Sequence, residues 1–430
     1  IVIAQNDDTT PGVAPTTANI VDNYARYTFA LAMNGNNLEL TPTLVAKPAG
    51  VSAAGAAVNA IADVAFATDT AMNDALQGLS GAVLDKALIS LAPEVDGGAI
   101  VGAVSAGGAA SNTISTQMAS LRSGIAAGQG INAGDGSNDK RFWAQGFGTY
   151  AEQQTRQSIN GFSASTGGMA FGLDKRVLNN LLIGGAYSYA YTAVDGSLSK
   201  NTTDIQSHQG TVYGSFDLDR SLVGDGAFLD GQVSYAYNDY SGNRHVDVGA
   251  VQRQAKSDYD GYQIGTKLEL GKTINLNDFR FTPSLGLSYS RVEIDKYTET
   301  RATTSNLTVN DQSYDILNNT LKAKVARTWQ VNGLDLTPEV HVGYSYEYLH
   351  QKIQATSNFG TAATNFTSIG FSPANHTYLG GLGMTYKGVT FDGKDALAGL
   401  PPVDFTLTYD FAAKDHFMSH SALLKGTWRF

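Results

Sequence analysis

Residues 421–430 read SALLKGTWRF, and this stretch decides how the rest of the chain is interpreted. Its alternate residues form one mainly apolar set and one mainly polar set, which is the pattern of a β-strand with a single wet face. The apolar set is Ala422, Leu424, Gly426, Trp428 and Phe430, and the polar set is Leu423, Lys425, Thr427 and Arg429. A strand that ends in aromatic residues is typical of a membrane barrel, whose aromatics lie at the lipid–water boundary. The alternative is the last strand of a soluble β-sandwich.

The composition of the 430-residue chain favours strands and turns over a helical enzyme. Only 16% of the residues are charged, while Gly (47) and Tyr (21) are abundant. No apolar run reaches the roughly 18 residues of a transmembrane helix, but a membrane barrel spreads its apolar residues over alternate positions. The net charge of −10 disfavours nucleic acid as a partner. The lack of cysteine rules out disulfides and thiolate metal sites.

The first hundred residues predict a hairpin followed by short helices. Two alternating runs, residues 25–32 and 38–45, flank Asn34-Gly35, which is a hairpin signal. Residues 51–91 are rich in alanine, and their apolar residues recur at helical spacing, which predicts two or three short helices before Pro93. Because the chain begins at Ile1 without a Met or a signal sequence, we expect a mature, processed or truncated form.

A single polar helix is predicted next. Residues 94–108 are rich in Gly and Ala and predict a linker. Residues 111–127, SNTISTQMASLRSGIAA, predict a helix with Ser111 or Asn112 as N-cap and Gly128 as its end. The face opposite its apolar residues carries Ser, Thr, Gln and one charge, Arg122. A small, polar, weakly charged helix suits a wet enclosed channel better than open solvent.

From Arg141 onward the apolar period is two. Twelve strands are predicted, over residues 142–152, 164–174, 181–192, 205–218, 227–238, 258–272, 279–294, 311–328, 334–348, 376–386, 403–411 and 421–430. The connections after the second, fourth, sixth and eighth strands are short, and those after the third, fifth, seventh and ninth are long and polar. This alternation predicts periplasmic turns and surface loops, although the tenth connection, residues 387–402, is too long for a turn. Trp143, Trp329 and Trp428 all fall at the predicted periplasmic boundary, where tryptophan is favoured.

Taken in order, these segments resemble the carboxy-terminal part of a monomeric autotransporter. The resemblance is carried by the hairpin YTFALAMNGNNLELTP, the helices ending LAPEVDGGAI, the polar helix ISTQMASLRSGI, the strand FWAQGFGTY and the terminus KGTWRF. It implies a mainly β fold, a twelve-stranded antiparallel transmembrane β-barrel with an α-helix in its pore, preceded by a short Ala-rich helical segment and a β-hairpin. The implied domains are the end of a passenger (1–48), the helical segment (49–100), the linker with the pore helix (101–139) and the outer-membrane barrel (140–430).

The resemblance also implies a function and its partners. The barrel would insert in the bacterial outer membrane, carry its own passenger to the cell surface and anchor it there. The implied partners are outer-membrane lipid, the barrel assembly machinery, periplasmic chaperones and the chain's own passenger, with the barrel acting as a monomer and without a cofactor. Gly426, Trp428 and Phe430 would form the assembly signal. Some family members cut themselves at an Asn-Asn pair in the pore helix, but here Asn112 is followed by Thr113, so we predict no such cleavage.

The remaining site predictions concern the pore wall. Strand phasing points nine polar side chains inward: Lys267, Glu269, Lys322, Lys324, Glu339, His341, Glu347, Lys425 and Arg429. We hypothesise that Arg122 pairs with Glu269, Glu339 or Glu347. The seven His residues lack metal-ligand spacing and no GxSxG elbow occurs, so neither a metal site nor catalysis is predicted. The alternative functions are a stand-alone twelve-stranded outer-membrane porin or channel, and a soluble all-β adhesin.

Overall fold

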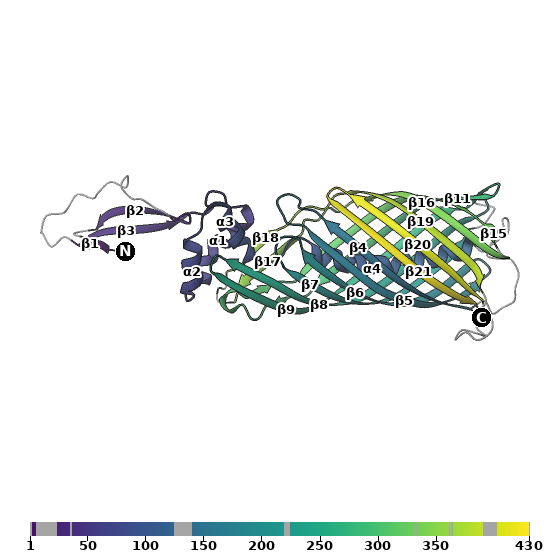
Figure 1. Cartoon of the computed structure of the whole chain (residues 1–430), viewed down its shortest axis with the longest axis horizontal. Coiled ribbons are helices and arrows are strands. Elements are labelled where there is room, and N and C mark those ends of the chain that lie inside the picture. Colours follow the sequence, from purple (N-terminus) through teal and green to yellow (C-terminus); the bar gives the residue numbers. More distant parts are fainter. Residues whose placement is uncertain are drawn as a thin grey trace.

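The structure, a computed structural model, is elongated, with a small sheet at one end, three helices in the middle and a large β-barrel (Figure 1). It describes residues 2–5, 24–34, 37–123, 140–218, 224–331, 333–360, 362, 364–389 and 402–429. Within α4 and the last strand, the side chains of residues 121–123 and 429 are also outside the description. No helix among the described residues is both long enough and apolar enough to cross a membrane.

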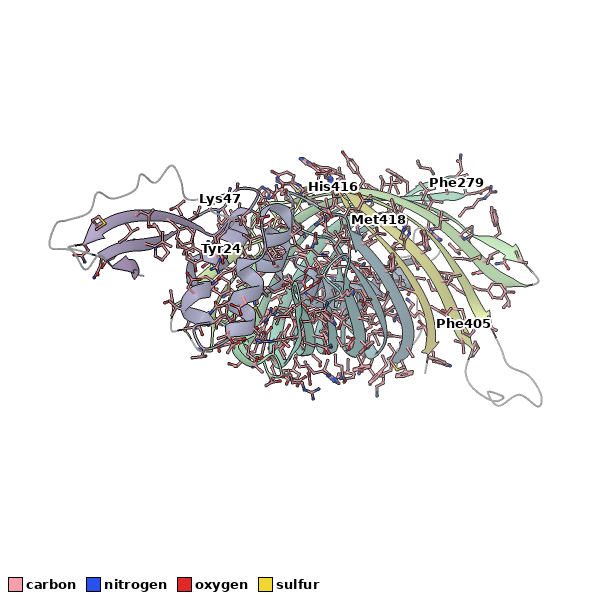
Figure 2. All side chains as sticks on the ribbon, turned by 60° about the vertical axis from the view of Figure 1, so that its left-hand side comes forward. Tyr24, Lys47, Phe279, Phe405, His416 and Met418 are labelled. Carbon is pink, nitrogen blue, oxygen red and sulfur yellow. The ribbon has the colours of Figure 1, made fainter. Side chains whose placement is uncertain are left out.

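The amino-terminal sheet contains the predicted hairpin. Strands β2 (Tyr27–Asn34) and β3 (Asn37–Leu44) pair in antiparallel register, and β1 (Val2–Gln5) adds to the free edge of β3. The base of the hairpin is tied to the next element through the buried Arg26, whose Nε donates to Asn59 Oδ1 at 2.6 Å. Figure 2 labels Tyr24 and Lys47, which flank this junction.

Three short helices form the part of the chain that we call the cap: α1 (Ala53–Ala65), α2 (Thr70–Gln77) and α3 (Gly81–Ser90). The side chains of Ser52 and Asp69 accept hydrogen bonds from the backbone N–H groups of Gly55 and Met72, which fixes the starts of α1 and α2. The alanine-rich sequence lets the helices approach closely. Their larger apolar side chains are buried in one core: Val58, Phe66, Met72, Leu76, Leu84, Leu88 and Leu91.

The barrel confirms the predicted fold class. Its twelve long strands are β4 (Lys140–Gln153), β5 (Phe162–Leu178), β6 (Leu181–Gly196), β7 (Thr202–Asp217), β8 (Ala227–Val248), β9 (Val251–Lys272), β11 (Phe279–Ile294), β14 (Gln312–Arg327), β16 (Leu334–Glu347), β19 (His376–Val389), β20 (Val403–Lys414) and β21 (Phe417–Arg429). Each pairs antiparallel with its neighbours, and β21 pairs with β4 to close the ring. Two short strands, β10 (Ile274–Leu276) and β15 (Trp329–Val331), extend the hairpins at one end.

Side chains of the barrel alternate between an apolar outer face and a polar interior. Leu424 is 56% exposed on the outside, while its neighbours Leu423 and Lys425 are 3% and 1% exposed inside. We call the end next to the cap the cap end, and the end where β4 begins the terminal end. In Figure 2, His416 in the β20–β21 turn lies toward the cap end, and Phe279 and Phe405 lie toward the terminal end.

The connections at the cap end differ from those predicted. The prediction of a long loop at residues 239–257 is wrong. Strands β8 and β9 continue through these residues as a hairpin, which ends in a two-residue turn at Gly249 and Ala250. The expected loop at residues 350–375 is also folded, since β17 (Gln354–Phe359) and β18 (Phe366–Ile369) join β12 (Tyr297–Thr298) and β13 (Leu307–Val309) in a four-stranded outer sheet. Of the unexplained tenth connection, residues 387–402, residues 387–389 continue β19, and residues 390–401 lie outside the described residues.

The predicted start of the polar helix is wrong. Helix α4 (Gly98–Ser123) begins at Gly98, so the expected linker at residues 94–108 is mostly helical and neither Ser111 nor Asn112 is an N-cap. Glycine lowers intrinsic helix propensity, but here the helix is enclosed, and tertiary packing overrides propensity. Its first N–H, that of Gly98, is satisfied by Asp96 Oδ1 at 2.8 Å.

Candidate functional site

The site is the lumen of the barrel, and α4 occupies one side of it (Figure 1). The helix packs mainly along β5, β6 and β7, with further contacts to β4 and β8. The chain therefore runs through the barrel from the cap end toward the terminal end, where β4 begins.

The half of α4 nearer the cap is held by close packing of its small residues against the barrel wall. A Cβ atom on Gly98 would lie 2.6 Å from Val194 Cγ1, and one on Gly102 would lie 2.7 Å from Ile205 Cδ1. Ala103, on the same stretch, is fully buried. The small residues thus let the helix backbone approach the wall closely, as protein interiors require. This explains why a Gly/Ala-rich stretch is helical here.

The half of α4 nearer the terminal end is held by hydrogen bonds. Ser115 Oγ accepts a bond from Lys267 Nζ at 2.9 Å and is 3.2 Å from Gln232 Nε2. Gln232 Nε2 also donates to the backbone carbonyl of Ser111 at 3.3 Å. Lysine 267, predicted to line the pore, therefore contacts the helix directly.

Lys425 is a second wall lysine that binds the helix. Its side chain is 1% exposed, and Nζ donates to the carbonyl of Thr116 at 3.2 Å and to Ser120 Oγ at 3.0 Å. A buried ammonium needs such partners, because an unpaired charge is costly to bury. Thr427, two residues further along β21, donates to Gln117 Oε1 at 3.4 Å. The last strand of the barrel thus contributes directly to holding the helix.

Asp174 on β5 is the centre of a buried network that the sequence did not single out. Its Oδ2 accepts bonds from Gln117 Nε2 at 2.8 Å and from the Tyr213 hydroxyl at 3.1 Å, while Arg141 lies 3.8 Å from Oδ1. The Tyr213 hydroxyl in turn accepts a bond from Trp143 Nε1 at 2.8 Å. The only signal for Asp174 was its inward phase at the end of a predicted strand.

This network corrects the interpretation of one tryptophan. Trp143 was expected at a membrane boundary, but its side chain is fully buried and points into the lumen. Gly172 on the neighbouring strand makes room for it, since a Cβ there would lie 2.6 Å from the indole ring. Trp329 is 46% exposed, and the Trp428 ring packs on Phe142 with the ring centroids 5.7 Å apart.

The wall opposite α4 carries ion pairs of its own. The pairs involve residues that were predicted to line the pore, with Asp410 as an addition. One pair joins the neighbouring strands β14 and β16, and the other two each reach across an intervening strand. The pairs are Lys322–Glu269 at 3.7 Å, Lys324–Glu339 at 3.2 Å and His341–Asp410 at 2.8 Å. Glu269 and Glu339, two of the partners hypothesised for Arg122, are thus paired with lysines of the wall. The Arg122 side chain itself lies outside the described residues.

The remaining predicted residues are placed as follows. Glu347, 9% exposed, lines the lumen toward the cap end, and Asn112 projects from α4 into the open side of the lumen. Gly426 lies on β21 opposite Ala144. The Arg429 side chain and the whole of Phe430 fall outside the described residues.

Space remains beside the helix. A cavity of about 430 Å³ lies between α4 and strands β11, β14 and β16, toward the cap end. A second cavity, of about 260 Å³, continues from it and is lined by the three ion pairs. The two cavities share Asn112, Glu269, Lys322 and Leu379. Within the described part of the chain, no three His, Asp or Glu side chains come together as metal ligands.

Comparisons with known proteins place the barrel in a family. Residues 142–388 match the family model described as the autotransporter beta-domain. Outer membrane protein A of Rickettsia conorii is 27% identical over 266 residues, which is 60% of this chain and 13% of that protein. Outer membrane protein B of Rickettsia rickettsii is 30% identical over 224 residues, 49% of this chain and 13% of that protein. The chain therefore spans only a small part of the length of these relatives.

The fold resembles a solved structure. The translocator domain of the autotransporter NalP from Neisseria meningitidis superposes with a TM-score of 0.54 and 14% sequence identity, over 77% of this chain and 99% of that one.

Proposed function

Because this chain belongs to the autotransporter family and its barrel is a translocator β-domain of the bacterial outer membrane, we propose that it carries its own passenger through the barrel and holds it at the cell surface. The observation that carries the proposal is the path of the chain. Helix α4 begins next to the cap, at one end of the barrel, and runs through the lumen toward the other end, where β4 begins.

The lumen suits this role through its polar walls. An unfolded chain in transit exposes backbone N–H and C=O groups, and a hydrated wall of Ser, Thr, Gln and paired charges lets water satisfy them. Once α4 forms, its backbone groups bond internally and its side chains bond to Lys267, Lys425 and Asp174. The finished helix therefore has a lower free energy in the lumen than the extended chain, which favours retention of the cap at the surface.

The proposal assigns a role to each part. The amino-terminal sheet is the end of the passenger at the cell surface, the cap is the helical segment between it and the pore helix, and the barrel acts as a monomer in outer-membrane lipid. Gly426, Trp428 and Phe430 present the barrel to the assembly machinery after periplasmic chaperones deliver it. No catalytic step and no cofactor is required of the barrel, whose family serves transport. The stand-alone porin alternative is not favoured, because α4 occupies the lumen and the family is that of autotransporters.

A reporter epitope tests the orientation. An epitope joined to Ile1 should be reached by antibody on intact cells. The matched control is the same epitope in the β5–β6 turn at Asn179 and Asn180, at the terminal end, which should be reached only after the outer membrane is permeabilised. The reverse pattern of access would contradict the proposal.

A further inference from the structure

Two cavities meet beside α4 at the cap end. A third cavity, of about 330 Å³, lies outside the first and is lined mostly by polar residues: Gln312, Ser313, Gln351, Lys352 and Gln354. Three residues line both this outer cavity and the inner cavity of about 430 Å³, namely Ile100, Tyr314 and Ile353. These three side chains therefore stand at the boundary between the two cavities.

The boundary residues come from three different elements and are all buried. Ile100 lies on the first turn of α4, Tyr314 on β14, and Ile353 on the connection that leads into β17. Their exposed fractions are 7%, 6% and 4%. The Tyr314 hydroxyl is used in a bond to the carbonyl of Gln351 at 3.0 Å, so the side that faces the passage is the apolar ring.

Ile353, which precedes β17, is held in place by the residue that follows β18. The Gly370 N–H donates to the Ile353 carbonyl at 2.8 Å, and a Cβ on Gly370 would lie 2.0 Å from the Val95 carbonyl oxygen. A Cβ on Gly97 would lie 2.3 Å from Ile353 Cδ1. The connection thus packs tightly against the residues just before α4, with no room for an added side chain at Gly370 or Gly97. The cap supports it from outside, where Phe66 meets Phe359 edge-on with ring centroids 5.0 Å apart.

We infer that Ile100, Tyr314 and Ile353 form a hydrophobic gate, which stops small hydrated ions from crossing the barrel along the half of the lumen that α4 leaves unfilled. A narrow apolar ring between two polar spaces excludes ions because water leaves it and the ions cannot shed their hydration. The helix then closes one side of the lumen, and this gate closes the other. The inner space that the gate protects is lined by charged groups such as Lys322 and Glu269, which would otherwise support conduction.

The test is the ion conductance of the full chain in planar bilayers. Ile353→Ser places a hydroxyl in the ring and should raise the conductance about tenfold above that of the parent protein, because a polar constriction stays wet. The matched control is Ile369→Ser on the same connection, where the side chain is 52% exposed and lines neither cavity; its conductance should equal the parent's.

A second gate variant makes the test independent of any local misfolding of the connection. Ile100→Ser changes the ring from the helix side and should also raise the conductance. Heat-dependent migration on gels, which reports an intact barrel, is measured for every variant. Parent-like conductance of both Ile353→Ser and Ile100→Ser, with the barrel intact, would overturn the gate, as would an equal rise in Ile369→Ser.

Discussion

The two halves of helix α4 are held in the same lumen by opposite means. The half nearer the cap, Gly98 to Ala110, has almost no polar side chains and fits the wall through glycine and alanine. The other half, Ser111 to Ser120, is held by hydrogen bonds from the wall through Lys267, Lys425 and Asp174. The first half depends on side-chain volume and the second on charge and hydrogen bonding, so one helix combines two independent attachments.

The difference follows from what surrounds each half. The half nearer the cap shares a hydrophobic core with the cap and the outer sheet, through residues such as Ile100 and Ala103. Close packing is therefore the main favourable contribution there. The half nearer the terminal end faces the charged wall and the second cavity, where unpaired polar groups would be costly and paired ones are retained. Substitutions can therefore weaken one attachment and leave the other intact.

The largest effect is expected from Asp174→Ala. The change removes the acceptor for Gln117 and Tyr213 and the carboxylate that lies 3.8 Å from Arg141, which should cost about 3 kcal/mol, as for other buried ion pairs that lose one member. Hydrogen exchange should speed up in residues 111–120 and change little in residues 98–110. The control is Asp410→Ala, on the wall opposite the helix, which breaks the pair with His341. Equal loss of protection in both halves would show that the attachments are not independent.

The converse experiment targets the packed half. Gly102→Val adds a side chain where a Cβ would already lie 2.7 Å from Ile205 Cδ1, and overpacking of this kind costs about 1–3 kcal/mol. Exchange should speed up in residues 98–110 and much less in the polar half.

Gly108→Val is the matched control for that experiment. It lies in the same helix, but a Cβ on Gly108 meets no atom within 4 Å, because this side of α4 faces the inner cavity. The control should therefore keep or slightly raise protection, since valine has a higher helix propensity than glycine. If both variants lost protection equally, helix propensity rather than packing would govern this half.

The comparison also explains what the sequence could and could not predict. The strands were predictable because a lipid-facing surface and a wet lumen impose strict alternation, which residues 334–348 show clearly. The polar half of α4 was predictable because its apolar residues keep helical spacing. The packed half was not, because its helicity comes from the wall, and a Gly/Ala stretch without that wall has the composition of a linker.

Similar reasons apply to the site residues. The strand alternation correctly predicted that Lys267 and Lys425 point into the lumen. Alternation alone cannot tell which inward side chains contact α4 and which lie on the part of the wall that α4 does not cover. Asp174 was missed because its importance depends on Gln117 and Tyr213, which come from a helix and a strand far apart in the sequence. Trp143 was misplaced because Trp was assumed to face lipid, whereas its N–H bonds to Tyr213 inside the lumen.

A smaller effect is expected from Ser115→Ala. The change removes the oxygen that accepts from Lys267 and lies near Gln232, and should cost about 1 kcal/mol in the polar half. Ser111→Ala is the control, because the bonds from Gln232 and Ser115 to Ser111 go to its main-chain carbonyl, which alanine keeps. Local exchange of residues 111–120 measures both. Parent-like protection in Ser115→Ala would assign the attachment to Lys425 and Asp174 instead.

The smallest effect is expected from acidification, which should first reduce the hydrogen-exchange protection of the packed half of α4. At the cap, Asp69 lies 2.6 Å from Arg253 of β9. Burial raises the pKa of Asp69, but hydrogen bonds from Thr304, Arg253 and the Met72 N–H outweigh this and hold it below the ordinary value of 3.8. The charged form is therefore favoured in the folded state, so its contribution is complete above that pH and is lost as the pH falls through the lowered pKa.

Acidification should consequently loosen the cap, and with it residues 98–110, whose core the cap shares. Exchange measured after brief exposure to a series of pH values from neutral to below 3.8 would follow this loss. Asp69→Asn removes the titrating group and should flatten that part of the profile, at the cost of a cap that is weaker at neutral pH. Acid-induced loosening of residues 111–120 before residues 98–110 would contradict the assignment, because the polar half has no contact with Asp69 among the described residues and should respond only when its own carboxylates titrate.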